Sequence, residues 1–267
     1  MITVNDVYKY LCSIAPPEMK MDFDNVGFLV GRADSEASKI LVSLDITVDV
    51  ISEAVEIGAG LIVSHHPLFF TLKSVTDTDL TGKKIIRLLS SGVSAICMHT
   101  NLDAARGGVN DALAEAAGIA DSGREAELLT EDNRLSSGEV FSYGRVGHLK
   151  EPCNMNEYIN MLKKALSAEG LRYHDAGRDV YKVAVVGGAG GDLLKHAVSQ
   201  GCDTFVTGDP NYHVFLDAKE LGINLIDGGH FCTENLVIGV LADNLRKEFP
   251  AADVVVSTRH KQTVRFF

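Results

Sequence analysis

The sequence predicts a protein of the α/β class, built from two related α/β lobes. Apolar segments of strand length alternate with segments whose apolar residues recur at helical spacing, and this alternation is present in both halves of the chain. A length of 267 residues allows two lobes of ordinary domain size. The hydrophobic content of 46% and the charged content of 23% are typical of soluble globular proteins.

The first half begins with an amphipathic helix in residues 1–20, which lack the basic start and long apolar stretch of a signal peptide. The helix that follows the first strand ends at Gly58, a residue typical of helix C-termini. The further elements that we predict in this half are strand 40–46, helix 48–58, strand 61–64, helix 82–92 and strand 93–99.

The second half repeats this rhythm. Residues 51–67 align with residues 194–210 without a gap, with identical residues at five positions that include a helix-terminal glycine and a proline after a strand. Residues 92–100 align in the same way with residues 222–230. We interpret this as an internal repeat of two α/β halves. The predicted elements are strand 183–188, helix 192–201, strand 204–208, helix 214–222 and strand 223–227.

A polar stretch at residues 122–149 separates the two halves and has strand character near its end. A helix is predicted for residues 154–170 with Asn154 as its cap, and the alternation in residues 257–267 predicts a final strand. We therefore predict a metal-binding lobe formed by residues 1–125 with 226–267, and a second α/β lobe formed by residues 126–225.

Imidazole and carboxylate side chains follow several predicted strands. In open α/β sheets, ligands collect outside the carboxyl ends of the strands. Glu234 comes four residues after His230, on the same face of a predicted helix. The residues at these positions are His65 and His66 after strand 61–64, His99 and Asp103 at and beyond the end of strand 93–99, and His230 and Glu234 after strand 223–227.

This mixture of ligands indicates a metal site. Imidazole with carboxylate suits Zn²⁺, Fe²⁺ and Mn²⁺, whereas Ca²⁺ prefers oxygen alone. A carboxylate can bridge two ions that lie about 3.5–4 Å apart and activate a water between them. Each residue alone is more often a packed or solvated side chain. Their joint occurrence at strand ends favours two divalent cations per subunit, at a site between the two lobes.

Several further motifs match one known family in order along the chain. The sequence resembles the GTP cyclohydrolase 1 type 2 homologs, also called the Nif-three-like dinuclear-metal proteins, over essentially its whole length, in the compact form without the mid-chain insert. The resemblance implies that His65, His66, Asp103, His230 and Glu234 hold two divalent metals, and that the protein forms a ring-shaped homohexamer. The matching segments are DNVG (24–27), SHHP (64–67), HTNLDAARGGVND (99–111), GGAGG (187–191), TGD (207–209) with YH (212–213), and GHFCTE (229–234).

Other motifs leave their roles open. His99 could be a proton carrier in catalysis, a partner that orients a ligand, or a packed residue. Residues 187–191 are either a cradle for phosphate or a tight, closely packed turn, and they fail the dinucleotide fingerprint. Asp24 and Asn25 form either a site or a turn. Tyr212 and His213 are possible substrate contacts.

The function that we predict is metal-dependent hydrolysis of a small, nucleotide-like substrate. The family name implies GTP, although fold and metal site alone do not determine a substrate. The alternative is a metal-binding or metal-delivery ring protein without turnover. A net charge of −11 argues against a nucleic-acid partner. The absence of a long apolar run argues against a membrane partner, and an odd number of cysteines without a C-x-x-C motif favours the reducing cytoplasm.

Overall fold

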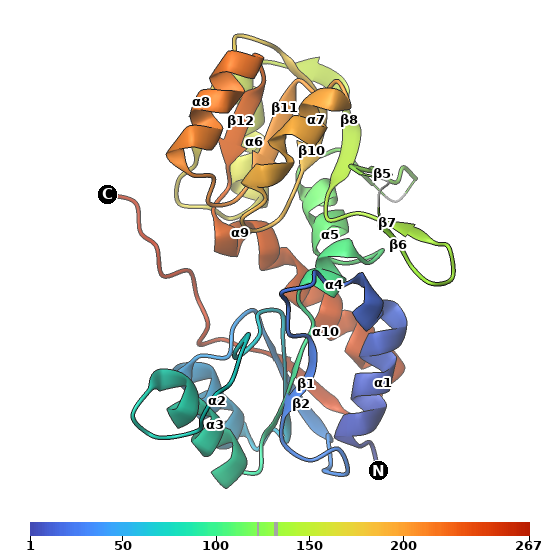
Figure 1. The fold of residues 1–267 in the computed structure, drawn as a ribbon, viewed down its shortest axis with the longest axis vertical. Helices are drawn as coiled ribbons and strands as arrows, with labels where there is room; N and C mark the ends of the chain where they lie inside the picture. The colour runs from blue at the N-terminus through green and yellow to red at the C-terminus, as the bar shows by residue number, and fades with distance from the viewer. Residues whose placement is uncertain (122, 131–132) are drawn as a thin grey trace. The chain divides into compact units, whose positions relative to one another are not determined.

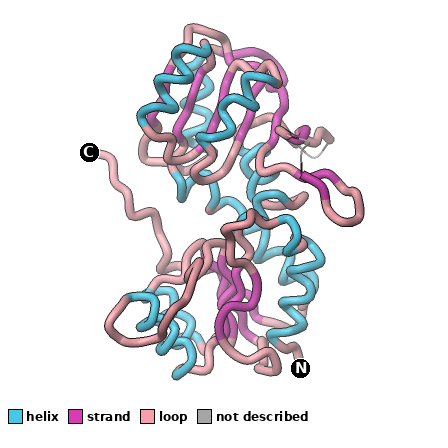
Figure 2. Tube along the Cα trace, in the orientation of Figure 1, coloured by secondary structure: helices cyan, strands magenta, loops and turns pink. Residues whose placement is uncertain are grey.

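A computed structural model of the chain describes residues 1–121, 123–130 and 133–267. Helices and strands are mixed throughout, which confirms the predicted α/β class (Figures 1 and 2). The division into a metal-binding lobe and a second lobe at the predicted boundaries stays a prediction. The chain divides by its backbone contacts into two compact units: unit 1 contains residues 1–106 and 238–261, and unit 2 contains residues 107–237 and 262–267.

Unit 1 contains a five-stranded sheet in the order β1-β4-β3-β2-β13. The strands β4, β3, β2 and β13 are parallel, and β1 is antiparallel to β4. Ser43, Ser64 and Cys97 are neighbours in register at the carboxyl ends of the three central strands. Residues that follow these strands therefore emerge at one edge of the sheet. The strands are β1 (Gly27–Val30), β2 (Lys39–Ser43), β3 (Leu61–Ser64), β4 (Ser94–Cys97) and β13 (Asp253–Val256).

Helices cover the sheet of unit 1 through apolar side chains. Ile51 of α2 and Leu88 of α3 are fully buried in a core with Ile62 of β3. The α2 helix ends at Gly58 as predicted, in a left-handed conformation with φ of +71°, and at its start the side chain of Thr47 accepts a hydrogen bond from the backbone of Val50. The helices are α1 (Val4–Ile14), η1 (Pro17–Met19), α2 (Val48–Ile57), α3 (Leu80–Ser90), α4 (Thr100–Ala104) and α10 (Leu236–Glu248), whose first two residues belong to unit 2.

Unit 2 contains a six-stranded sheet in the order β5-β8-β10-β11-β12-β9, with β10, β11 and β12 parallel. Both units thus contain a β-α-β-α-β succession with three parallel strands. The internal repeat in the sequence stays a prediction. The strands are β5 (Glu127–Leu128), β8 (Arg145–Cys153), β9 (Arg172–His174), β10 (Val180–Val185), β11 (Thr204–Thr207) and β12 (Asn224–Asp227), with the separate hairpin of β6 (Asn133–Arg134) and β7 (Val140–Phe141).

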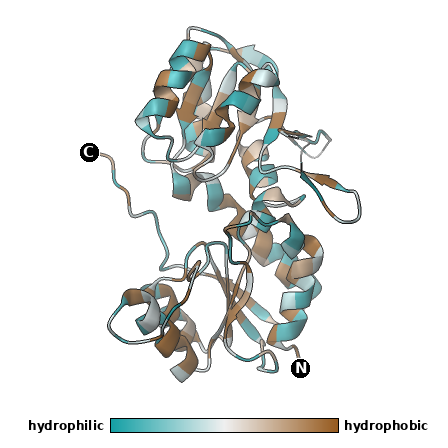
Figure 3. Cartoon of the chain, viewed as in Figure 1, coloured by the Kyte–Doolittle hydropathy of each residue, from teal (hydrophilic) through white to brown (hydrophobic). Residues whose placement is uncertain are grey.

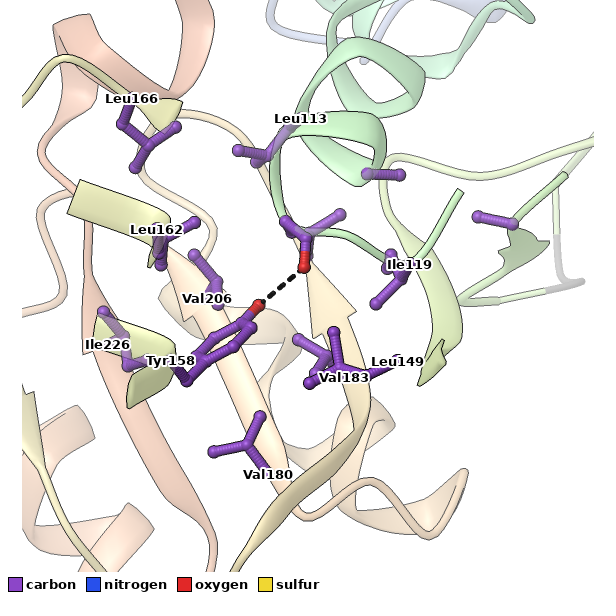
Figure 4. Packing of buried hydrophobic residues seen from close by; sticks show 14 of the residues in the cluster. Leu113, Ile119, Leu149, Tyr158, Leu162, Leu166, Val180, Val183, Val206 and Ile226 are labelled. Atoms are coloured by element: carbon purple, nitrogen blue, oxygen red, sulfur yellow. Dashed lines mark hydrogen bonds between the residues drawn. The ribbon is translucent and has the colours of Figure 1, made fainter. Parts of the chain in front are cut away.

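Alternate residues of the central strands in unit 2 pack on opposite faces of the sheet. Val206 of β11 packs in a cluster with α5 and α6, in which the buried Tyr158 donates a hydrogen bond of 3.1 Å to the carbonyl of Ala117 (Figure 4). The adjacent Phe205 packs on the other face against α7 and α8. The helices are α5 (Val109–Ala116), α6 (Met155–Ala165) with the predicted Asn154 cap, η2 (Gly191–Leu193), α7 (Leu194–Ser199), α8 (Tyr212–Leu221) and α9 (His230–Glu234).

The prediction of a final strand in residues 257–267 was wrong. The last strand is β13, and residues 257–267 form no strand. The carboxylate of Glu53 in α2 accepts hydrogen bonds from the backbone and hydroxyl of Thr258, at 2.9 and 2.8 Å, and from the hydroxyl of Ser257. The backbone N–H of Thr258 is thus bonded to a side chain of α2 and not to a neighbouring strand.

Figure 3 shows that hydrophobic and hydrophilic residues are mixed along α1 and α8. Within the described residues, no helix combines the length and the apolar character needed to cross a membrane. Residues 122, 131 and 132 of the polar stretch between the halves lie outside the described residues.

Candidate metal centre

Three histidines converge at the carboxyl edge of the sheet in unit 1. His65 and His66 follow β3, and His99 follows β4 and precedes α4. The ring centroids lie 5.0 Å apart for His65 and His66, 5.2 Å for His65 and His99, and 5.5 Å for His66 and His99. One nitrogen from each ring lies within 4.8 Å of the other two, so these three residues could hold a metal ion.

Asp103 joins this group from α4. Its Oδ1 lies 3.5 Å from Nε2 of His65. The short helix places it there because its backbone N–H donates to the carbonyl of His99, 3.1 Å away. Unit 1 therefore brings together four of the six predicted site residues.

The remaining two residues lie in unit 2, both on α9. His230 is its first residue and Glu234 its last, and the helical spacing predicted from the sequence sets Nε2 of His230 3.2 Å from Oε2 of Glu234. Glu234 is buried and His230 is partly exposed. Unit 2 thus offers a second imidazole–carboxylate pair.

Each of the four histidines has an oxygen acceptor at Nδ1, and this contact fixes its tautomer. Because a carbonyl or an ionised carboxylate only accepts hydrogen bonds, Nδ1 must carry a proton, and in the neutral ring Nε2 then carries the lone pair. This orientation of metal-binding histidines by an acceptor behind the ring is common in metalloproteins. The Nδ1 contacts are His65 to Met98 O at 2.8 Å, His66 to Asp45 Oδ1 at 2.9 Å, His99 to Asp24 Oδ1 at 2.8 Å and His230 to Asp209 Oδ2 at 3.1 Å.

The donor atoms have the spacing that a metal ion requires. Two ligands that each lie ~2.1 Å from one ion, at angles between the octahedral and tetrahedral values, are about 3.0–3.4 Å apart. The separation of 3.2 Å between His230 and Glu234 lies within this range, and that of 3.5 Å between His65 and Asp103 lies just above it. In each pair a nitrogen lone pair faces a carboxylate oxygen, which favours a cation between them. These residues fit a divalent transition ion.

Asp24, which the sequence left open between a site and a turn, contacts one of the clustered histidines. Its buried carboxylate holds His99 and also accepts hydrogen bonds from the backbone and hydroxyl of Thr100. Burial by itself raises the pKa of Asp24, but the hydrogen bonds from His99 and Thr100 outweigh this effect and hold the pKa well below its usual range. Asp24 is therefore ionised at neutral pH.

The sequence analysis missed Asp45 and His260. Asp45 lies between two imidazoles, with Oδ1 on His66 and Oδ2 2.8 Å from Nε2 of His260. Burial raises the pKa of Asp45, but the contacts with His260 and His66 more than offset it and lower the pKa. Since β2 ends at Ser43, Asp45 follows a strand like the predicted ligands, but the predicted strand 40–46 concealed this position.

Asp209 was also missed as a partner of His230. Its φ of +48° is unusual for a residue other than glycine and stores backbone strain. The backbone N–H of Asp209 donates to Asp227 Oδ1 at 3.1 Å, and that oxygen also accepts from Gly229 at 2.9 Å. Asp227 thereby fixes the two turns that carry Asp209 and His230.

The glycine-rich residues 187–191 form a closely packed turn. Gly188 has a φ of +63°, and a Cβ there would lie 2.1 Å from Oε1 of Glu234. The backbone N–H groups of Gly187, Gly188 and Gly190 donate to Asn110, Thr233 and Thr207. These three groups are already bonded within the protein, which favours packing over a phosphate cradle.

Tyr212 and His213 lie at the start of α8, and His230 of α9 follows seventeen residues after His213 in the sequence. The Tyr212 side chain is 71% exposed, and its ring lies 5.7 Å from that of His213. The structure shows no further side-chain contact that assigns either residue to a site. Their role as substrate contacts stays a prediction.

Nearly the whole chain matches a known protein family. Residues 2–263 match the family Duf34/NIF3 (NGG1p interacting factor 3). The chain belongs to this family. The resemblance seen in the sequence motifs is thereby confirmed. The alignment with a relative from Halalkalibacterium halodurans runs over 355 positions, more than the 267 residues present here, so that relative contains inserted segments that this chain lacks.

Two relatives, each named GTP cyclohydrolase 1 type 2 homolog, align with nearly the whole chain. The GTP cyclohydrolase 1 type 2 homolog of Clostridium perfringens is 36% identical over 98% of this chain and 99% of its own length. The protein of the same name from Campylobacter jejuni is 32% identical over 99% of both chains.

Solved structures share the fold. The Bacillus cereus protein related to NIF3 has a TM-score of 0.91 at 23% identity and covers 100% of this chain and 99% of its own. The Staphylococcus aureus hypothetical protein SA1388 has a TM-score of 0.90 at 27% identity, with 99% of both chains covered. At 23% identity, the likeness to the Bacillus cereus protein supports a shared fold and nothing further.

Proposed function

We propose that this NIF3-family protein is a metal-dependent hydrolase that holds two divalent cations per subunit through His65, His66, Asp103, His230 and Glu234. The observation that carries the proposal is the common orientation of the histidines, each with Nδ1 on an oxygen acceptor and with a carboxylate opposite Nε2 in two cases. Zn²⁺, Fe²⁺ and Mn²⁺ all suit these ligands.

Bound divalent cations would polarise the substrate and make a water a stronger nucleophile at neutral pH. The chain's own residues supply the rest. Asp24 holds the His99 ring in one tautomer, so that its Nε2 can accept a proton and later return it. Asp45 and Asp209 keep the rings of His66 and His230 in place and raise the basicity of their Nε2 atoms.

We propose a small, nucleotide-like substrate. The support is the printed name of the relatives, GTP cyclohydrolase 1 type 2 homolog, which points to hydrolysis at C8 of a guanine ring. We further propose a homohexamer in the cytoplasm, an assembly that light scattering at low concentration would test. The alternative, a metal-binding or metal-delivery ring without turnover, uses the same ligands.

The decisive experiment compares metal content and turnover in matched variants. Wild-type protein purified without chelator should approach two divalent metals per subunit and hydrolyse a member of a nucleotide and phosphoester panel. Asp103→Asn and Glu234→Gln keep side-chain shape but remove a charge, and each should lose metal and activity. Asp217→Asn, on the exposed side of α8, is the control and should change neither.

His99→Ala separates a ligand from a proton carrier. We expect this variant to keep both metals and lose activity. Metal content near zero in wild-type protein supplied with Zn²⁺ or Mn²⁺ would contradict the site. Full metal content without turnover on any substrate would instead support the binding protein, and turnover in metal-free Asp103→Asn would contradict the chemistry.

A further inference from the structure

Two phenylalanines beside the histidine cluster of unit 1 are exposed although the backbone around them is firmly held. The Phe23 side chain is 65% exposed and that of Phe70 is 51% exposed. Their ring centroids lie 6.1 Å apart at an angle of 52°. Single exposed apolar residues are common and need no explanation, but a pair of aromatic rings in contact next to candidate ligands does.

Polar contacts of neighbouring residues hold the backbone of the two loops that carry these rings. Asp24, next to Phe23, is buried and bonded to His99 and Thr100. The side-chain amide of Asn25 donates a hydrogen bond of 2.8 Å to the carbonyl of Phe69, which precedes Phe70. The loop that carries Phe23 is thus tied both to the residue after β4 and to the loop that carries Phe70.

The aromatic pair is continuous with the candidate metal centre. The rings of Phe70 and His99 meet edge to face, with centroids 5.9 Å apart and an interplanar angle of 60°. The His99 ring is in turn 5.2 Å from that of His65 and 5.5 Å from that of His66. A molecule that lies on the phenylalanines would therefore place its neighbouring atoms at the histidines.

We infer that Phe23 and Phe70 form an aromatic platform on which a planar aromatic or heteroaromatic ring of the substrate stacks beside His99. Exposed π-faces bind flat rings without requiring a particular pattern of hydrogen bonds. The inference rests on the proposed function, since it takes the neighbouring histidines to be part of a hydrolytic metal centre. It adds that the substrate must contain a planar ring. It also assigns specificity to residues outside the predicted ligand set.

The test compares two probes that differ by one ring. Guanosine 5′-monophosphate contains a planar base, and ribose 5-phosphate is the same molecule without it. Calorimetry with metal-replete wild-type protein should show tighter binding of the nucleotide by about tenfold or more, since stacking of one base is worth roughly ten- to a hundredfold in affinity.

Variants of the platform should remove this preference selectively. Phe23→Ala with Phe70→Ala should weaken nucleotide binding by about tenfold to a hundredfold and leave ribose 5-phosphate unchanged. The Tyr pair at the same positions should retain the preference, because it keeps the flat faces. Phe267→Ala, at the exposed chain end, is the matched control. Metal content is measured for each variant, and if the alanine pair loses metal, the leucine pair replaces it.

Three outcomes would overturn the platform: equal affinity of wild-type protein for both probes, unchanged nucleotide affinity in the alanine and leucine pairs, or a change of molecular mass in these variants, which would make the face a contact between copies of the chain. The proposed function fails separately. Ring-dependent binding without any turnover would contradict the proposed hydrolase and support the aromatic platform. Hydrolysis of ring-free phosphoesters without a preference for a ring would support the hydrolase and contradict the platform.

Discussion

Asp45 is the residue through which the orientation of a proposed ligand can be tested without altering any ligand. Its Oδ1 lies 2.9 Å from Nδ1 of His66 and its Oδ2 lies 2.8 Å from Nε2 of His260. Loss of such a partner behind a metal-binding histidine typically weakens metal affinity by about 10–100-fold, or about 1.4–2.8 kcal/mol. Asp45→Asn keeps an oxygen for His66 and should fall near the lower limit. Asp45→Ala keeps neither contact and should fall near the upper limit.

The effect should be confined to one of the two ions, because among the proposed ligands Asp45 contacts His66. Competition titration of Zn²⁺ against a chromophoric chelator resolves the two binding steps. We expect one step to weaken in both variants and the other to stay within about twofold of wild type, with Asp217→Asn as the exposed control. If both steps in Asp45→Ala remain within twofold of wild type, Asp45 does not orient a ligand and our interpretation of the Nδ1 contacts is wrong.

Further predictions concern the packing around the site and the fold. Gly188→Ala introduces a Cβ 2.1 Å from Oε1 of Glu234 at a φ of +63°, and we expect it to weaken metal binding and to lower stability. The control Gly58→Ala has a similar φ of +71° but no atom within 4 Å of the new Cβ. It should lower the free energy of unfolding, measured with denaturant, by only about 1 kcal/mol. Tyr158→Phe leaves a buried carbonyl without its donor and should lower the free energy of unfolding by about 1–2 kcal/mol. Burial raises the pKa of Glu53, but the hydrogen bonds that its carboxylate accepts outweigh burial, and the net effect is a lowered pKa. The ionised carboxylate of Glu53 therefore stabilises the fold at a pH above its pKa in the unfolded chain. This stabilisation is lost as the pH falls through the lower pKa of the folded protein. Metal-free Glu53→Gln should therefore lose less stability than wild type as the pH falls below the usual pKa of a glutamate side chain, as measured by urea unfolding.

The types of the central elements were predictable because they depend on local periodicity, whereas the exact ends of several strands were not. The run of apolar residues before His65 forms β3, and the four-residue spacing of His230 and Glu234 places both on one face of α9. Parallel strands end at a common edge, so the convergence of His65, His66, His99 and Asp103 follows from the order of elements alone.

The partners behind the ligands were not predictable, because they depend on register and on distant segments. Asp45 was hidden inside the predicted strand 40–46, whereas β2 ends at Ser43 and leaves Asp45 beyond the edge of the sheet. His260 lies in the segment predicted as a final strand. It reaches Asp45 because Glu53 binds the residues just before it, a contact between positions more than two hundred residues apart in the chain.

The charge around the histidines gives a reason to propose two cations rather than one. Three of the four imidazoles have an aspartate behind them, Asp24, Asp45 and Asp209, and two face a further carboxylate, Asp103 or Glu234. Hydrogen bonds hold the pKa of Asp24 and Asp45 below the usual range in spite of burial, so these groups stay ionised at neutral pH. Concentrated negative charge that is partly removed from water is costly unless cations compensate it. Three of these carboxylates, Asp24, Asp45 and Asp103, belong to unit 1, and the other two, Asp209 and Glu234, belong to unit 2. The negative charge within each unit is thus comparable to the charge of one divalent ion, which is the reason to propose two ions per chain. Each Nδ1 lies against an oxygen acceptor, so Nε2 is the nitrogen through which each ring would bind a cation.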